Sequence, residues 1–344
     1  MADSSQESSF VKPGSATATA HPNLALIKYW GNRDDALRLP RNGSISMTLA
    51  GLHTVTRVRF DSELEADRVT LNRRPATPAE RQRVVQHLDL VRRQAGVDTS
   101  AEVVSASDFP SEAGLASSAS AFAALSLAAA AAGGLDLTAS DLSRLARRGS
   151  GSACRSVFGG YVEWRAGEDD GTSFAEPIAD AGHWALVDLI ALVETVPKAV
   201  GSTEGHQLAA TSPLQEARVA SAPRRLEACR RALLDRNFAS LVEVVERDCH
   251  LMHAVMQTSS PPLLYWAPAT ISVIQMVRTW REQGDDLCYT LDAGPNIHCL
   301  CPATVADEMA DRLGHIPGVL RVLAAGPGGP ARLLDPQDPL LALL

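Results

Sequence analysis

A Gly/Ser-rich loop opens a long Ala-rich segment at Pro110-Ser-Glu-Ala-Gly-Leu-Ala-Ser-Ser-Ala-Ser120. Alanine is the strongest helix former, so residues 119–132 predict a helix, and the serines within it favour a buried helix over a membrane span. The first N–H groups of such a helix lack partners and lie at the positive end of its dipole, which suits a phosphate. The stretch therefore predicts either a phosphate-binding loop or an ordinary helix start.

Three residues in this loop suit a phosphate. Gly114 permits a tight turn, and the hydroxyls of Ser117 and Ser118 would bind phosphate oxygens or Mg²⁺. The pattern is not a Walker A loop, because no Gly-Lys-Ser/Thr follows, and Gly-x-Gly-x-x-Gly is absent. The two common nucleotide-binding fingerprints therefore do not apply.

The composition is that of an ordinary globular protein. The 344 residues suffice for one large domain or two smaller ones, and 45% are hydrophobic and 21% charged. The formal net charge of -8 argues against non-specific nucleic-acid binding, yet it allows a local cluster of basic groups around an anion. The polar N-terminus has no apolar h-region, so no signal peptide is expected.

Neither the cysteines nor the histidines show a metal pattern. His250 and His253 lie three residues apart on an expected helix without a third ligand, so a structural role is favoured. The cysteines are expected to be buried thiols in a reducing compartment: Cys154, Cys229, Cys249, Cys288, Cys299 and Cys301.

Expected helices and strands are mixed without a regular βαβ repeat, which predicts an α+β fold. Residues 1–14 are expected to be disordered. The helical pattern over 213–257 is expected to break at Pro223 and at the turn Asp235-Arg236-Asn237. The other expected helices are 78–95, 139–148, 269–282 and 305–313, and the expected strands are 54–60, 102–106, 158–165, 184–194, 287–291, 297–301 and 319–324.

Two further loops each carry one charged side chain. Small residues surround Arg155 in Gly149-Ser-Gly-Ser-Ala-Cys-Arg-Ser156, which suits a bidentate pair with a ligand carboxylate. Asp292 ends an apolar strand in Leu291-Asp-Ala-Gly-Pro-Asn296, where it would serve as a base or an orienting group. Taken singly, a solvated arginine and an aspartate that starts a turn are the better explanations.

A fourth stretch, Asn23-Leu-Ala-Leu-Ile-Lys-Tyr-Trp-Gly31, ends an apolar run with a cation and two aromatic rings. Two roles are open for Lys28, Tyr29 and Trp30. They would either line a ligand pocket or only pack at the end of a strand. Two weaker loops remain: Lys198-Ala-Val-Gly-Ser-Thr203 would bind an anion, and Gly326-Pro-Gly-Gly329 would approach a ligand or merely turn.

Together these stretches resemble the diphosphomevalonate decarboxylase family of the GHMP kinase superfamily, over about residues 18–325. The specific matches, in order and at similar spacing, are 23–31, 109–120, 149–156 and 292–296. The resemblance implies a ribosomal-S5-like N-terminal half at 15–190, a ferredoxin-like C-terminal half at 191–335 and a tail at 336–344.

The resemblance also implies a reaction, in which ATP phosphorylates the tertiary C3 hydroxyl of mevalonate 5-diphosphate and loss of phosphate and CO₂ gives isopentenyl diphosphate. A cytoplasmic homodimer that uses ATP and Mg²⁺, with no nucleic-acid or membrane partner, is expected. The resemblance assigns catalysis to Asp292, Arg155 and Lys28, substrate binding to Asn23, Tyr29, Trp30, Asn32, Ser150, Ser152, Arg155 and Ser202, ATP binding to Gly114, Leu115, Ala116, Ser117, Ser118 and Ser120, and the metal to Ser118.

The sequence departs from the family pattern at three positions. Asn32 replaces a lysine that is thought to meet the substrate's diphosphate, Gly201 replaces a serine, and His206 replaces a methionine. Arg33 or Arg41 would compensate for the lost cation. A decarboxylase of mevalonate 5-phosphate or another 3-hydroxy acid, and a small-molecule kinase of the same superfamily, therefore remain alternatives.

Overall fold

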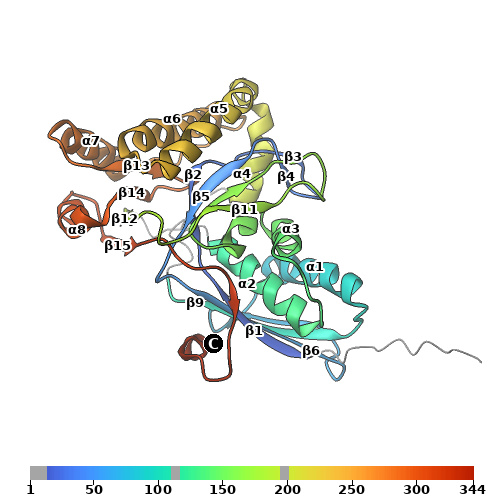
Figure 1. The fold of residues 1–344 in the computed structure, drawn as a ribbon. Coiled ribbons are helices and arrows are strands. Elements are labelled where there is room, and N and C mark those ends of the chain that lie inside the picture. The colour runs from blue at the N-terminus through green and yellow to red at the C-terminus, as the bar shows by residue number, and fades with distance from the viewer. Residues whose placement is uncertain (1–13, 110–116, 194–200) are drawn as a thin grey trace, which may run out of the picture.

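The computed structural model describes residues 14–109, 117–193 and 201–344, which form three larger sheets, a two-stranded ribbon and the helices that pack on them (Figure 1). The expected mixture of helices and strands is confirmed. Residues 1–13 of the segment that is predicted to be disordered lie outside the described residues, as do 110–116 and 194–200.

The first sheet has six strands in the order β16-β1-β6-β9-β7-β8, and only β7 and β9 are parallel neighbours. The strand expected at 54–60 is confirmed as β6, and from Thr56 to Phe60 its buried and exposed residues alternate. Helices α1, α2 and α3 cover one face of this sheet (Figure 1). Its strands are β1 (Ser15–Ala20), β6 (Thr54–Asp61), β7 (Arg68–Leu71), β8 (Arg74–Pro75), β9 (Ser100–Ser107) and β16 (Arg332–Leu333).

The second sheet, in the order β11-β10-β5-β2, lies in the middle of the molecule (Figure 1). Every residue of β2 and β5 is buried, because helices pack on both of its faces. Its strands are β2 (Asn23–Ile27), β5 (Ser44–Thr48), β10 (Tyr161–Trp164) and β11 (Ala175–Ala179), and the adjoining ribbon is β3 (Asn32–Asp34) with β4 (Leu39–Pro40).

The third sheet is antiparallel, in the order β13-β14-β12-β15, and helices α6, α7 and α8 pack against it. The strand expected at 184–194 is confirmed as β12, an inner strand, and residue 190 lies within it. The four strands are β12 (Leu186–Leu192), β13 (Cys288–Leu291), β14 (Ile297–Pro302) and β15 (Arg321–Ala325).

Local signals fix several helix ends. Thr77 and Glu80 form the capping box that begins α1, and Gly96 ends it at φ 64°. Thr138 caps α3. The helices are α1 (Pro78–Ala95), α2 (Ser117–Ala132), α3 (Ala139–Gly149), α4 (Ser202–Leu208), α5 (Gln215–Leu234), α6 (Phe238–Gln257), α7 (Pro268–Glu282) and α8 (Ala306–Gly314), and the 3₁₀ turns are η1 (Gly151–Val157), η2 (Ala209–Thr211), η3 (Ala303–Val305) and η4 (Pro339–Leu343).

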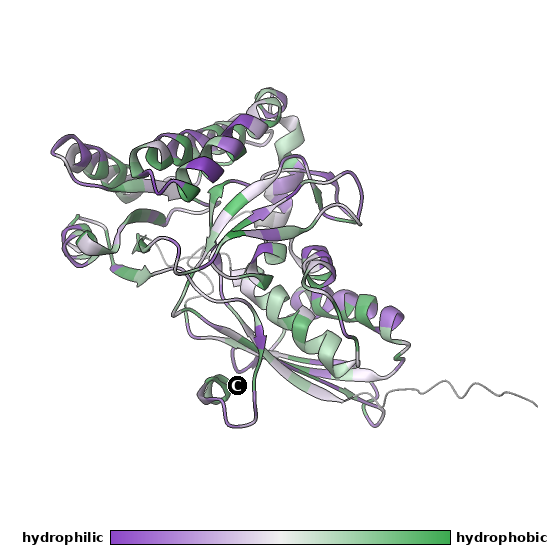
Figure 2. Cartoon of the chain, viewed as in Figure 1, coloured by the Kyte–Doolittle hydropathy of each residue, from purple (hydrophilic) through white to green (hydrophobic). Residues whose placement is uncertain are grey.

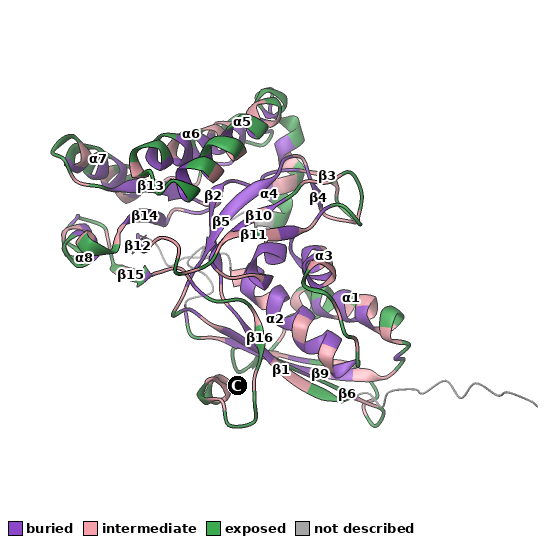
Figure 3. Ribbon diagram, viewed as in Figure 1, coloured by how far each residue is buried: buried purple, intermediate pink, exposed green. Residues whose placement is uncertain are grey.

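The core confirms two expectations. The Ala-rich segment forms the buried helix α2, which is mostly green, meaning hydrophobic, in Figure 2 and largely purple, meaning buried, in Figure 3. All six cysteines are buried and unpaired. Within the described residues, no helix is long and apolar enough to cross a membrane.

The break expected at Pro223 is wrong, because α5 runs through this residue without interruption. Pro223 is exposed, whereas Arg218 and Arg225 on the opposite face are buried and hydrogen-bonded within the protein. A proline inside a helix costs about 3 kcal/mol. We attribute the continuity of α5 to these tertiary contacts, which outweigh the local cost.

The glycine turn at 326–329 has a structural role. Gly328 donates its N–H to the carbonyl of Thr48 at 2.7 Å and accepts a hydrogen bond from the N–H of Gly160 at 2.8 Å. The turn therefore fastens the C-terminal segment to the central sheet, which resolves the choice between ligand approach and a plain turn in favour of the turn.

We expect Gly160→Ala to destabilise the protein far more than Gly51→Ala. Both glycines have left-handed φ angles, 72° and 74°, so alanine costs about 1–2 kcal/mol at either. At Gly160 the added Cβ would also lie 2.3 Å from the backbone oxygen of Ala179, whereas at Gly51 nothing lies within 4 Å. Denaturant unfolding of the two variants measures the difference, and equal losses would contradict this account.

Candidate active site

Lys28 and Asp292 form an ion pair where two sheets meet. Lys28 follows the last residue of β2, Asp292 follows the last residue of β13, and Nζ lies 2.7 Å from Oδ1. Lys28 is 1% exposed and Asp292 26% exposed. The lysine is therefore sealed inside the protein, while the carboxylate retains an open side.

Asp292 is held in its ionised form. Burial acts to raise the pKa of this carboxyl, but the attraction of Lys28, followed by His298 and Arg155, outweighs it. The pKa of Asp292 consequently lies below the usual value for an aspartate. An ionised carboxylate with an accessible oxygen can accept a hydrogen bond or a proton from a ligand.

Buried side chains of two helices fix the backbone of Lys28. Its N–H donates to Asp248 Oδ2 of α6 at 2.6 Å, and Arg225 of α5 donates its Nε to Asp248 Oδ1 at 2.6 Å. Its carbonyl accepts from Arg218 Nη2 of α5 at 2.8 Å and from Asn42 Nδ2 at 3.0 Å. Sequence reasoning missed these residues, since nothing in a helical pattern marks which polar side chains are buried.

Arg155 lies in η1 and is also fixed from behind. It is 2% exposed, donates its Nη2 to Asn23 Oδ1 at 3.0 Å and donates its Nη1 to Ser44 Oγ at 2.5 Å. Asn23 in turn donates its Nδ2 to Ser156 Oγ at 2.8 Å and to the Ser152 carbonyl at 3.2 Å. Asn23 therefore orients the guanidinium, and Asp292 and Arg155 are close enough to act electrostatically on each other.

An aromatic wall continues from Lys28. The Tyr29 ring packs edge-on against Trp164 at 4.7 Å, and its hydroxyl donates to Asn32 Oδ1. The ring lies so close to Gly151 that a Cβ there would be 2.5 Å from it, so only glycine fits. Trp30 is 2% exposed and packs in a small cluster with Met252, Val255, Met256 and Leu263.

His206 closes the same wall from α4. Its ring centre lies 4.1 Å from that of Tyr29 and 4.6 Å from that of Trp30, and its Nδ1 accepts the N–H of Gly31 at 2.9 Å. The imidazole therefore fixes the turn that follows Trp30. The backbone of Ser202 begins α4, and its side chain lies outside the described residues.

The serines divide into two groups. Ser118 Oγ lies 3.1 Å from Ser150 Oγ, which joins the start of α2 to the loop that carries Arg155. Ser120 is fully buried and hydrogen-bonded to Thr54 Oγ1 at 2.7 Å, so it secures the first turn of α2. Gly114, Leu115 and Ala116 lie outside the described residues.

A cavity of about 210 Å³ opens beside the start of α2. Hydroxyl groups from the first sheet and from α2 form its polar wall, and Phe122, Leu71 and Val103 form an apolar wall. Because Ser118 lines the cavity and also meets Ser150, the cavity adjoins the Arg155 loop. Such a mixed lining suits a flat heterocycle with a charged tail.

The histidines that were assigned a structural role make protein contacts. His250 Nε2 lies 2.7 Å from Tyr289 Oη, and burial lowers the pKa of His253 to about 3. In the described parts of the chain, no group of three or more His, Cys, Asp or Glu residues could hold a metal ion. A metal here would need oxygen ligands from Ser118 and from a bound phosphate.

Both halves of the chain match sequence families. The diphosphomevalonate decarboxylase-like N-terminal domain matches residues 20–175, and the mevalonate 5-diphosphate decarboxylase C-terminal domain matches residues 188–319. The diphosphomevalonate decarboxylases of Candida albicans and Aspergillus fumigatus are 38% and 43% identical over 325 and 303 residues. These alignments cover 88% and 82% of this chain and 90% and 75% of the relatives.

Solved structures agree over nearly the whole chain. Mevalonate diphosphate decarboxylase from Staphylococcus aureus superimposes with a TM-score of 0.89 at 36% identity, covering 94% of this chain and 98% of that one. MDDEF in complex with MVAPP, AMPPCP and magnesium superimposes with a TM-score of 0.88 at 38% identity, covering 93% and 99%. The architecture is thus the GHMP-kinase-like α+β fold. Within that class, the chain belongs to the diphosphomevalonate decarboxylase family.

We expect Lys28→Met to raise the pKa of the Asp292 carboxyl, because burial then acts without its main opposing charge. Asp292 should stay ionised at lower pH in the wild type than in this variant. An NMR titration of the carboxyl groups measures the pKa of Asp292 in both proteins, and the Asp292→Asn variant identifies the Asp292 signal. Lys28→Arg keeps the charge and should stay near the wild-type value, and an unchanged titration in Lys28→Met would contradict the expectation.

Proposed function

We propose that this chain is an ATP-dependent decarboxylase that converts mevalonate 5-diphosphate to isopentenyl diphosphate, ADP, phosphate and CO₂. The observation that carries the proposal is the Lys28–Asp292 pair beside Arg155, next to the serine-lined cavity. Membership of the family, and the MVAPP and AMPPCP complexes of its relative MDDEF, support this substrate and this nucleotide.

Asp292 would receive the substrate's C3 hydroxyl. Its low pKa keeps it ionised, so it can orient the hydroxyl and take its proton as the oxygen attacks the terminal phosphorus of ATP. The P–O bond to ADP breaks in the same step. Lys28 holds the carboxylate oxygen in place at 2.7 Å, and it limits the build-up of negative charge.

Arg155 would bind the substrate carboxylate. Phosphate leaves from C3, and the electron pair of the breaking C–C bond forms the alkene as CO₂ departs. Because Asn23 and Ser44 fix the guanidinium from behind, it can align the carboxylate without reorganising. Ser150 and Ser152 flank this position and are proposed to contact the substrate.

The cavity beside α2 would hold ATP. Its mixed walls suit the nucleoside, and the start of α2 with Ser117 and Ser118 suits the phosphates. Mg²⁺, present in the MDDEF complex, would bind Ser118 and phosphate oxygens and would neutralise charge on the transferred group. Ser120 would act through the helix start, and Gly114, Leu115 and Ala116 remain part of this proposed nucleotide site.

One observation favours a second candidate, mevalonate 5-phosphate. Asn32 is neutral and binds Tyr29 and Asp35. Arg33 donates to the carbonyls of residues 166 and 167, and Arg41 pairs with Glu216, so neither compensates for the missing lysine. The absence of a cation at position 32 itself favours a substrate with fewer phosphates.

The proposal also includes the cellular setting. Six buried, unpaired cysteines support a reducing compartment such as the cytoplasm. We propose that the chain divides into two halves, at 15–190 and 191–335. By resemblance to the family we also propose a homodimer, and light scattering of the purified chain measures its oligomeric state directly.

The reaction is tested by incubating the purified protein with ATP, Mg²⁺ and either mevalonate 5-diphosphate or mevalonate 5-phosphate, and by measuring the ADP and CO₂ that are formed. We expect equal amounts of both products with mevalonate 5-diphosphate. Turnover of mevalonate 5-phosphate alone would select the second candidate. ADP without CO₂ would make the chain a kinase, and neither product would reject both substrates.

We expect Asp292→Asn to lower CO₂ release by at least about 100-fold, because the amide cannot take the hydroxyl proton. The start of α2 is untouched, so binding of a non-hydrolysable ATP analogue by calorimetry should stay within about threefold of wild type. Glu216→Gln removes an exposed carboxylate that pairs with Arg41 in the first turn of α5, and it serves as the matched control. Near-normal turnover by Asp292→Asn would remove this residue from the proposed role.

A further inference from the structure

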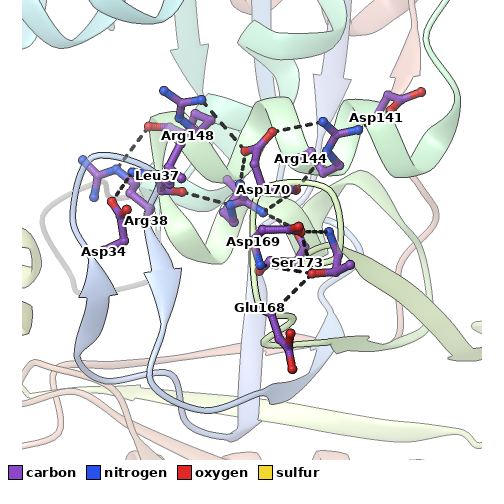
Figure 4. Close-up of polar contacts among 12 residues, drawn as sticks. Asp34, Leu37, Arg38, Asp141, Arg144, Arg148, Glu168, Asp169, Asp170 and Ser173 are labelled. Carbon is purple, nitrogen blue, oxygen red and sulfur yellow. Dashed lines mark hydrogen bonds and ion pairs between the residues drawn. The ribbon is translucent and has the colours of Figure 1, made fainter.

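Arg38 occupies an unusual backbone position beside the proposed site. It lies in the turn of the β3–β4 ribbon with φ 50°, a conformation that side chains other than glycine rarely adopt. Its Nε donates to the carbonyl of Arg148 at 3.1 Å, at the end of α3 (Figure 4). The turn thus directs this guanidinium towards the segment that leads into Ser150.

Arg38 lies between the substrate wall and the cavity proposed for ATP, which Arg83 lines. Arg83 donates its Nη2 to the carbonyl of Gly149 at 3.4 Å, one residue beyond the Arg38 contact. The next residue, Ser150, meets Ser118. Burial raises the pKa of Tyr29, and Arg38 is the strongest of the charges that oppose this increase, so Arg38 lies near the phenol.

Positive charge is in excess at this place. Within the described residues, Arg38 and Arg83 have no carboxylate within 4.0 Å. Arg148 reaches only Asp170, at 3.9 Å, and Asp170 is already paired with Arg144 at 3.0 Å and with Arg147 (Figure 4). Arg144 has a second carboxylate partner in Asp141, whereas Arg148 has no closer one than Asp170 in the described parts of the chain. Arg38, Arg83 and Arg148 therefore leave an excess of positive charge here, which favours a bound anion.

The nearby acids are engaged with other partners. Asp34 accepts the N–H of Leu37 at 2.7 Å, and Asp35 accepts Asn32 Nδ2 at 2.7 Å. Arg33 and Arg41 are turned to other partners as well. Of the three arginines between residues 33 and 41, only Arg38 contacts the end of α3.

We propose that Arg38, supported by Arg148, binds the distal phosphoryl group of the substrate and supplies the positive charge that Asn32 does not. This inference rests on the proposed function, since it concerns the same substrate. A simpler role, in which Arg38 only satisfies a carbonyl at the end of α3, predicts no dependence on the ligand's phosphates.

The test compares Arg38→Gln with Arg33→Gln and Arg41→Gln, which make the same charge change in the same ribbon. We expect Arg38→Gln to raise KM for mevalonate 5-diphosphate about 10- to 100-fold with kcat within about threefold, the range for a lost charge-assisted hydrogen bond. The two controls should keep the wild-type KM. Asn32→Lys should restore KM in the Arg38→Gln background.

Calorimetric binding of inorganic pyrophosphate separates this inference from the proposed function. Binding by wild type that is weakened in Arg38→Gln and retained in Arg38→Lys supports the role of Arg38, even if no CO₂ is released. Equal pyrophosphate affinity and equal KM in wild type and Arg38→Gln would overturn the proposal and leave Arg38 as a helix-end contact. A rise in KM of the same size in Arg33→Gln and Arg41→Gln would overturn it as well.

Discussion

The contact between Lys28 Nζ and Asp292 Oδ1 joins residues 264 positions apart in the chain. A charged lysine that is sealed from water requires a carboxylate partner, since an isolated buried charge is strongly unfavourable. The end of β2 must therefore meet the end of β13, and this requirement sets the second and third sheets in contact. Asp292 then lies close enough to Arg155 for the two charges to act on each other. One electrostatic constraint thus determines both the packing of the sheets and the position of the reactive carboxylate.

Behind this pair lies a second layer of charge that no ligand would touch. Asp248, Arg225 and Arg218 are almost wholly buried. Asp248 accepts the N–H of Lys28, Arg218 donates to its carbonyl, and Arg225 donates to Asp248. Buried ion pairs contribute little net stability, although breaking one costs about 3–5 kcal/mol. Their value here is positional, because they fix where the lysine leaves the strand, and Asn23 does the same for Arg155.

Local features were predictable from the sequence, and long-range partners were not. The capped ends of α1 and α3, the buried helix α2 and most strands follow from patterns within a few residues. The resemblance also brought together Lys28, Arg155 and Asp292. The sequence offered no means to see that Asn23 would bind Arg155, that Trp30 would pack into a core cluster, or that α5 would continue through Pro223, because each depends on partners distant in the chain.

The pairing of β16 with β1 has a consequence for synthesis on the ribosome. Ala18 and Thr19 pair with Leu333 and Arg332, so β1 receives its outer neighbour only after the residues between these two strands have been made. Until then one edge of β1 is an exposed row of backbone hydrogen-bonding groups, which invites pairing with another chain. The nascent chain would therefore be vulnerable to aggregation at this edge until β16 has been made, and a chaperone that covers the edge would act before that point.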